Sequence, residues 1–290
     1  MTVRGARLQV RDITVRFDGV VALDAVAFTA EPGSIHAVIG PNGAGKSSLF
    51  NVLSGIYRPA RGSVLVDGEE LVGRAPHRVA ALGVGRAFQN GSMFAGLTVE
   101  ENLLLGRHRL GRGGVLGAGL RLPHVRRSER ESRAKVRAVA EFLGVDHLLP
   151  LPAAELPYGE AKRVDIARAL ATEPRLLLLD EPAAGMHTHE KVAIRDTIRR
   201  IAAEQAVTVL LVEHDMGLVM GIAEQVTVLD FGQVVLTGPP ERVSTDDRVI
   251  AAYLGRAGAA EKERSRSRAR PSPALEAPAP EAFSPEPPKP

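Results

Sequence analysis

Cysteine is absent from this 290-residue sequence, which excludes disulfide scaffolds, thiolate zinc sites and cysteine nucleophiles. The sequence also lacks any run of about 18 apolar residues and any charged-then-apolar leader after Met1, so it predicts neither a membrane span nor a signal peptide. The excess of 37 basic over 34 acidic residues is too small to favour a nucleic-acid partner. We therefore expect a cytoplasmic protein that reaches a membrane only through a partner.

Proline and charge are concentrated in the last part of the sequence. Residues 261–270 are almost all charged or serine, and the last twenty residues hold eight of the twenty prolines. Such a segment cannot bury enough apolar surface to offset the entropy that it loses on ordering. We predict that residues 257–290 form a disordered Pro/Arg-rich tail, with a polyproline ligand for another domain as the alternative.

Residues 1–255 alternate strand-like and helix-like patterns, and the chain is 44% hydrophobic, which suffices for a core. Continuous apolar runs predict buried strands at 35–39, 176–179 and 207–212, and edge strands are predicted at 8–10 and 13–15. Helices are predicted at 45–53 and at 190–204, where Ile194, Ile198 and Ile201 recur at spacings of four and three. This alternation favours an α/β fold around a parallel sheet.

The middle of the chain, about residues 97–171, is different because no strand is predicted there. Thr98 and Glu101 fit a capping box, in which each side chain accepts a backbone N–H of the other at a helix start. Residues 110–122 hold five glycines and predict a mobile loop, and 128–143 predict a helix with a basic, solvated outer face. We expect a helical subdomain inserted into the α/β domain.

Residues 40–47 match the phosphate-loop pattern G-x-x-x-x-G-K-S, between a predicted strand and a predicted helix. Glycines allow several backbone N–H groups to face one anion, and the helix N-terminus adds a favourable dipole. We predict that Lys46 contacts the β- and γ-phosphates of a nucleotide and that the Ser47 hydroxyl binds Mg²⁺. The predicted nucleotide-binding residues of this loop are Gly40, Pro41, Asn42, Gly43, Ala44, Gly45, Lys46, Ser47 and Ser48.

Four leucines at 176–179 are followed by Asp180 and Glu181, so an apolar strand is predicted to end in two carboxylates. Asp180 is predicted to hold Mg²⁺ through water, and Glu181 to accept a proton from an attacking water. Repulsion between adjacent carboxylates raises the pKa of one of them, which suits a base. A strand ending in Asp-Glu is common by itself, so this prediction depends on the phosphate loop upstream.

With these motifs in this order, the sequence resembles the ATP-binding subunits of ABC transporters over about residues 7–255. The resemblance implies an α/β P-loop ABC ATPase cassette with a mixed sheet, an antiparallel β edge and an inserted helical subdomain at about 97–171. It also implies ATP and Mg²⁺ as cofactors, and hydrolysis of ATP to ADP and phosphate coupled to transport across a membrane.

Further motifs acquire roles only from this resemblance. Phe17 stands where the family stacks an aromatic ring on adenine, Gln89 matches the residue that touches Mg²⁺ and links the site to the membrane partner, and His214 matches a switch histidine at the γ-phosphate. Taken alone, Phe17 could be a core residue, Gln89 an exposed polar residue and His214 a structural histidine. The family's signature, which reaches the γ-phosphate of the opposite subunit, is matched by Pro157, Tyr158, Gly159 and Glu160.

Shorter patterns at 86–89, 158–159, 181–186, 213–216, 219–221 and 253–255 are similar to those of branched-chain amino acid importers. This similarity implies integral-membrane permease subunits as partners and a second, different ATPase subunit, with a homodimer as the alternative. It also implies a substrate-binding protein as an indirect partner, no nucleic acid, and a peripheral position on the cytoplasmic face of the inner or plasma membrane.

Two parts of the sequence depart from the superfamily pattern. Pro157 stands in place of a serine at the start of the signature, and His187 stands in place of an aspartate in the dimer-contact loop at 184–187. Our hypothesis is that the two composite ATP sites are unequal, and that the site built from this chain's phosphate loop is the more active one. Alternative functions are a urea or amide importer, a lipid exporter, a soluble ABC ATPase acting on DNA or ribosomes, and a P-loop GTPase or kinase.

Overall fold

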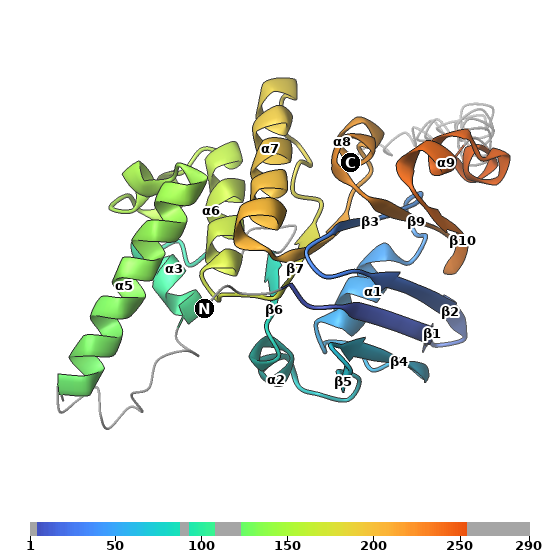
Figure 1. Ribbon diagram of the computed structural model, residues 1–290, viewed down its shortest axis with the longest axis horizontal. Coiled ribbons are helices and arrows are strands. Elements are labelled where there is room, and N and C mark those ends of the chain that lie inside the picture. Colours follow the sequence, from blue (N-terminus) through green and yellow to red (C-terminus); the bar gives the residue numbers. More distant parts are fainter. Residues whose placement is uncertain (1–4, 88–92, 108–122, 254–290) are drawn as a thin grey trace, which may run out of the picture. The chain divides into compact units, whose positions relative to one another are not determined.

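The structure is a computed structural model that describes residues 5–87, 93–107 and 123–253, with the backbone alone at 123–126 (Figure 1). Gln89, the glycine-rich stretch at 110–122 and the tail at 257–290 lie outside these residues. The predicted boundaries of the cassette, 7–255, therefore stay a prediction.

A six-stranded sheet forms the centre of the described part, in the order β10-β9-β3-β8-β7-β6. The pairs β9–β3, β3–β8, β8–β7 and β7–β6 are parallel, and β10 pairs with β9 antiparallel. The three predicted buried strands are confirmed, since every residue of β3, β7 and β8 is buried. The strand bounds are β3 Ile35–Ile39, β6 Val84–Ala87, β7 Leu176–Asp180, β8 Thr208–Val212, β9 Gln225–Asp230 and β10 Gln233–Gly238.

A second, antiparallel sheet has the order β2-β1-β4-β5, with β1 Leu8–Phe17, β2 Val20–Ala30, β4 Arg61–Val66 and β5 Glu69–Glu70. The prediction of two edge strands at 8–10 and 13–15 is wrong, because both belong to β1, which pairs with β2 on one side and β4 on the other. An irregularity at Arg11 and Asp12, where Asp12 has a φ of 58°, interrupts the alternation and splits the sequence signal in two.

Successive leucines of β7 belong to two different cores. Leu176 and Leu178 pack in the core that includes helix α1 (Lys46–Leu53) and the antiparallel sheet. Leu177 and Leu179 pack in the core that includes helices α6 (Tyr158–Leu170) and α7 (Thr188–Gln205). The central sheet is therefore covered on both faces, which is why its strands have continuous apolar sequences. Helix α7 (Thr188–Gln205) buries Ile194, Ile198 and Ile201, as its spacing predicts.

Helices α3 (Val99–Arg107), α5 (Pro123–Leu143) and α6 (Tyr158–Leu170) gather at one side of the central sheet (Figure 1). The capping box before α3 is confirmed, since Thr98 N–H donates to Glu101 Oε2 (2.8 Å) and Glu101 N–H to Thr98 Oγ1 (3.3 Å). Among the described residues of 97–171 the only β pairing is an isolated bridge between Thr98 and Pro152. The remaining helices are α2 (Pro76–Ala81), α8 (Met216–Ile222), α9 (Pro240–Thr245) and the 3₁₀ turns Asp146–Leu148 and Ala153–Glu155.

In the part of the chain that the structure describes, no helix combines the length and the apolar character needed to cross a bilayer.

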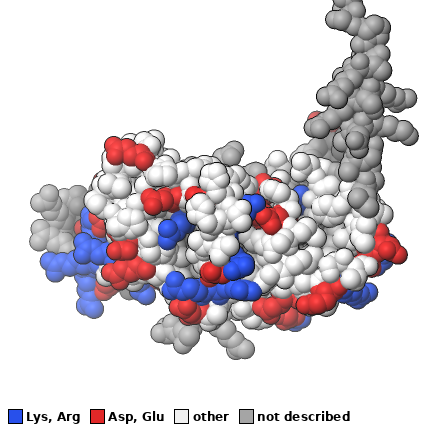
Figure 2. Space-filling view, turned by 90° about the horizontal axis from the view of Figure 1, so that it is seen from above, with Lys and Arg blue, Asp and Glu red and all other residues white. Residues whose placement is uncertain are grey.

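Acidic and basic side chains alternate along the edge of the face drawn in Figure 2, and a broad uncharged area lies between them.

His36, in the middle of β3, is fully buried and its Nε2 lies 2.9 Å from Thr227 Oγ1. Burial lowers the pKa of His36 from 6.5 to about 4. Between these two values the unfolded chain binds a proton that the folded chain rejects, so stability falls as the pH drops from 6.5 to 4, by about 3 kcal/mol. Urea unfolding at pH 7 and pH 4 should show this loss in the wild type and less of it in His36→Gln. If the stability of the two proteins depended equally on pH, His36 would not be the source of this loss.

Candidate nucleotide-binding site

The sheet order brings the predicted site residues to one edge. The phosphate loop follows β3, His214 comes two residues after β8, Asp180 ends β7, and β6 ends at Ala87, two residues before Gln89. These four strands are adjacent and parallel, in the order β3-β8-β7-β6. Ligands of open α/β sheets bind at this carboxyl edge.

The phosphate loop has a backbone that only glycine accommodates. Gly40 has a φ of 153° and Gly45 a φ of 104°. A Cβ atom on Gly40 would lie 2.1 Å from the carbonyl oxygen of Leu229, and one on Gly45 would lie 2.6 Å from that of Ala22. Helix α1 follows with no side-chain cap at Gly45 and no acidic residue in its first turn, so its dipole favours an anion at this end.

Lys46 is buried, and its ammonium lies within the loop itself. Nζ donates to the carbonyl oxygens of Gly40 (2.6 Å) and Pro41 (3.1 Å). The next residue, Ser47, is exposed. An ammonium, a hydroxyl and open amide groups at one helix start are the donors that fit a polyphosphate with its Mg²⁺.

Asp180 is buried and forms an ion pair with Arg86 of β6, with 2.8 Å between Oδ2 and Nη2. The same guanidinium donates to Asn51 Oδ1 (3.0 Å) and Ser54 Oγ (2.9 Å), at the end of α1. Arg86 therefore links the acidic end of β7 to the helix that starts at the phosphate loop. Sequence reasoning missed this role, although an arginine inside a short strand was a signal for it.

Glu181 is half-buried and has a φ of 47°, in the left-handed region that a glutamate rarely occupies. Its N–H donates to the carbonyl oxygen of Val212, at the end of β8 (2.9 Å). The chain therefore turns sharply just after Asp180, while the turn stays attached to the neighbouring strand.

Glu213 is a buried carboxylate that joins two loops of the site, and sequence reasoning did not single it out. One oxygen accepts the Ala183 N–H (2.9 Å), and the other accepts the N–H groups of His214 (3.1 Å) and Asp215 (3.4 Å). Its side chain is 0% exposed, and burial raises its pKa although these donors oppose the shift. The loop after β7 and the loop after β8 are thus held together by one side chain.

His214 projects from this fixed backbone with 54% of its side chain exposed, which excludes the interpretation of a buried structural histidine. The following residue, Asp215, caps helix α8 by accepting the Leu218 N–H (3.1 Å) and pairs with Lys191 Nζ (2.7 Å). The hydrogen bond from Lys191 lowers the pKa of Asp215.

Lys162, on α6, places a buried positive charge near the acidic residues of the site. Burial lowers its pKa, and the nearby Asp165, Asp180, Glu181 and Glu213 oppose that shift. This cation balances part of the negative charge gathered at the carboxyl edge, and no sequence pattern pointed to it.

The signature residues begin α6, with Pro157 as its N-cap and Tyr158 as its first residue. Pro157 thus lies just before the first turn, and the helix forms without its N–H. Tyr158 Oη donates to the Ala184 carbonyl (2.9 Å), and a Cβ on Gly159 would lie 2.3 Å from Glu190 Oε1. The start of α6 is therefore attached to the loop after β7, and contact with a second subunit stays a prediction.

Phe17 is the last residue of β1 and is 43% exposed. Its ring contacts Tyr57 edge-on, with 5.1 Å between the ring centroids. The exposure excludes the alternative of a core residue, and the stacking on adenine stays a prediction.

Known proteins share this combination of fold and motifs. A profile of the ABC transporter family matches residues 23–184, and a profile named branched-chain amino acid ATP-binding cassette transporter matches residues 233–259. BraF of Pseudomonas aeruginosa, a high-affinity branched-chain amino acid transport ATP-binding protein, is 40% identical over 250 residues, which are 86% of this chain and 98% of BraF. LivG of Escherichia coli K12, described in the same words, is 37% identical with the same coverage.

Solved structures agree with this likeness. The ADP conformation of MJ1267, an ATP-binding cassette of an ABC transporter, superimposes with a TM-score of 0.75 and 30% identity, over 86% of this chain and 99% of that one. A nucleotide-free cassette from an ABC transporter superimposes with a TM-score of 0.73 and 29% identity, over 86% and 98%.

Replacing Glu213 by alanine should destabilise the chain by about 3 kcal/mol, because three backbone donors near the site lose their buried acceptor. Urea unfolding measures this loss. The matched control is Glu204→Ala, whose exposed pair with Arg200 is worth under about 1 kcal/mol. Equal stabilities of the two variants would show that Glu213 does not hold the loops together.

Proposed function

This chain belongs to the ABC transporter family of ATP-binding proteins, and we propose that it is the ATP-hydrolysing subunit of an importer of branched-chain amino acids. The observation that carries the proposal is the phosphate loop around Lys46 beside the carboxylates of Asp180 and Glu181 and the exposed His214, on adjacent parallel strands. The cargo class is supported by the profile match at 233–259 and by the names of BraF and LivG.

We assign the polyphosphate of ATP to the loop and to the N-terminus of α1, whose dipole favours an anion. Lys46 would exchange a carbonyl partner for phosphate oxygens. Ser47, Gln89 and, through water, Asp180 would hold Mg²⁺, which neutralises charge on the β- and γ-phosphates when bound. The ion pair with Arg86 would hold the Asp180 carboxylate in place for this role.

Glu181 is the proposed general base. A water would attack the γ-phosphorus and give its proton to the Glu181 carboxylate, while the bond to the ADP oxygen breaks and phosphate leaves. Lys46 and His214 would stabilise the negative charge that develops on the γ-phosphoryl oxygens. Glu213 acts here only as a positioning residue, because it holds the backbone of both loops.

One subunit does not complete this environment, so we propose a head-to-tail dimer in which the start of α6 from each subunit faces the other's γ-phosphate. The partner is proposed to be a second, different ATPase subunit, with a homodimer as the alternative. Pro157 brings no hydroxyl and no N–H to that contact, so the site that uses this chain's own phosphate loop is proposed to be the more active one.

The proposed permease contact lies beyond Gln89, at Phe94 and Leu151, which are 60% and 39% exposed. Asn102 is fully buried and holds Phe94 from both sides, since Oδ1 accepts the Phe94 N–H (2.8 Å) and Nδ2 donates to the Phe94 carbonyl (3.1 Å). The segment with Leu151 is adjacent, because Val99 N–H donates to the Leu151 carbonyl (2.9 Å). An apolar ring held outward suits a permease helix, and we propose a peripheral position for the chain at the cytoplasmic face of the membrane.

The exchange Glu181→Gln should leave ATP affinity within about twofold of wild type and lower turnover by about 100-fold or more, because the glutamine cannot accept the proton. Nucleotide titration and phosphate release with the partner ATPase measure the two effects, and size exclusion should show an ATP-dependent dimer. Glu204→Gln, on the exposed face of α7, is the control. Near-normal turnover of Glu181→Gln would remove this residue from the role of base.

The exchange Phe94→Asp should abolish ATP-driven leucine uptake by the assembled importer, because a charge replaces the proposed apolar contact. ATP binding by the isolated chain should stay within about twofold, since Phe94 lies outside the phosphate loop. Val192→Asp, at an exposed apolar position on α7, is the matched control. Normal uptake with Phe94→Asp would place the permease elsewhere, and uptake of urea instead of leucine by the wild type would refute the cargo class.

A further inference from the structure

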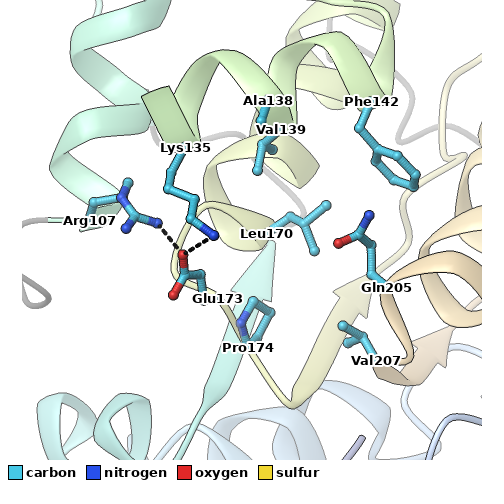
Figure 3. A pocket seen from close by; sticks show the side chains of 10 residues that line it. All are labelled: Arg107, Lys135, Ala138, Val139, Phe142, Leu170, Glu173, Pro174, Gln205 and Val207. Atoms are coloured by element: carbon cyan, nitrogen blue, oxygen red, sulfur yellow. Dashed lines mark hydrogen bonds and ion pairs between the residues drawn. The ribbon is translucent and has the colours of Figure 1, made fainter. Parts of the chain in front are cut away.

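A cavity of about 460 Å³ lies at the opposite edge of the central sheet from the nucleotide site (Figure 3). Pro174 lies two residues before β7 and Val207 directly before β8, and both line the cavity, whereas Asp180 and Glu213 stand at the other ends of these strands. Val139 and Phe142, from α5, form the facing wall. The cavity is therefore separate from the site described above and lies between the helical subdomain and the sheet.

Charged and apolar groups occupy different parts of this cavity. Leu170, Val139 and Phe142 present aliphatic and aromatic surface, and Arg107, Lys135 and Glu173 meet at one side (Figure 3). Glu173 Oε1 lies 3.2 Å from Arg107 Nη1 and 3.4 Å from Lys135 Nζ. Two cations and one carboxylate leave this cluster with a net positive charge.

Arg107 is a built part of the cavity and not a surface side chain. Only 8% of its side chain is exposed, and Nη1 is fixed by the Ala171 carbonyl (2.8 Å) as well as by Glu173. Its Nε is buried without a hydrogen-bond partner among the described residues. The guanidinium is therefore held in place at the cavity wall, where its positive charge favours an anionic group of a ligand.

Lys135 and Glu173 are more open, with 61% and 40% of their side chains exposed, so both can turn toward a ligand. A carboxylate would find the Arg107 guanidinium and Lys135 as donors, and an ammonium would find Glu173 as acceptor. The aliphatic body of the same molecule would lie against Leu170 and Val139. These three requirements together describe an α-amino acid with an apolar side chain.

We propose that this cavity binds a free aliphatic α-amino acid of the leucine type, a proposal that takes its cargo class from the proposed function. The zwitterion replaces the direct contact between Lys135 and Glu173 with two contacts of its own, and the side chain fills the apolar part. Because Val139 belongs to α5 and Val207 precedes β8, the bound amino acid ties the helical subdomain to the sheet. The chain thereby carries a second small-molecule site, which reports the concentration of the imported compound.

Calorimetric titration of the full chain, without nucleotide or permease, tests the site with three probes. L-leucine should bind saturably at one site. The 2-oxo acid of leucine lacks the ammonium and 3-methylbutylamine lacks the carboxylate, so each should bind at least about tenfold more weakly, equivalent to about 1.4 kcal/mol. No saturable leucine binding, or equal binding of the 2-oxo acid, would overturn the proposal.

Two variants locate the binding within the chain. Glu173→Gln removes the partner of the ammonium at a half-exposed position and should weaken leucine binding at least about tenfold. Affinity for the anionic 2-oxo acid should not fall, because the variant removes a negative charge beside Arg107 and Lys135. Val139→Trp should fill the cavity and abolish binding of both, and Glu204→Gln is the control that leaves binding unchanged. If leucine binding is unchanged in both cavity variants, leucine does not bind in this cavity and the proposal is wrong.

This experiment and the tests of the proposed function fail separately. A chain that hydrolyses ATP and drives leucine uptake but does not bind leucine refutes only the cavity proposal. A chain that binds leucine at this site while its importer carries another compound refutes the cargo class and leaves the amino-acid site in place.

Discussion

The register between β3, β8 and β7 is the constraint on which the rest of the site depends. Val212, the last residue of β8, is paired with Val38 on one side and with Asp180 on the other, and its carbonyl accepts the Glu181 N–H. The approach to the phosphate loop, the strand end before His214 and the acidic pair therefore lie at one level. Successive side chains along a strand point to opposite faces of the sheet. A slip of β8 by one residue would therefore move each of its side chains to the other face and would shift His214 away from the phosphate loop and the acidic pair.

Buried charged side chains are concentrated at the carboxyl ends of β3, β8 and β7, and each of these charges is balanced by groups close to it. Asp180 has Arg86, Glu213 has three backbone donors, and Lys162 lies near the acidic groups at the ends of β7 and β8 and near Asp165 of its own helix. Removing one member of a buried pair leaves a charge that costs several kcal/mol. The groups that shape the site are therefore also groups that keep the chain folded, and the chemistry is hard to change without affecting stability.

Short-range patterns in the sequence predict the central strands and the phosphate loop, because the physical cause is local: apolar runs at 35–39 and 176–179, and glycines where Gly40 and Gly45 need a positive φ. Long-range pairing is not local. The irregularity at Asp12 made one interior strand resemble two edge strands, and the roles of Arg86 and Glu213 depend on residues far away in the sequence. The assignments of Phe17, Gln89 and the signature came from family resemblance, which the geometry of one chain does not test.

Arg86 connects the acidic end of β7 to the helix that follows the phosphate loop, and neither of these two motifs contains this connection by itself. Its guanidinium bonds Asp180 and the side chains of Asn51 and Ser54, and it stands one residue before the end of β6, where the chain leaves the sheet toward Gln89. A pull applied to the chain beyond Ala87 would therefore act at the same moment on Asp180, the proposed Mg²⁺-holding carboxylate, and on the C-terminal end of helix α1. A displacement imposed by a membrane partner would therefore move the acidic end of β7 and the helix after the phosphate loop together.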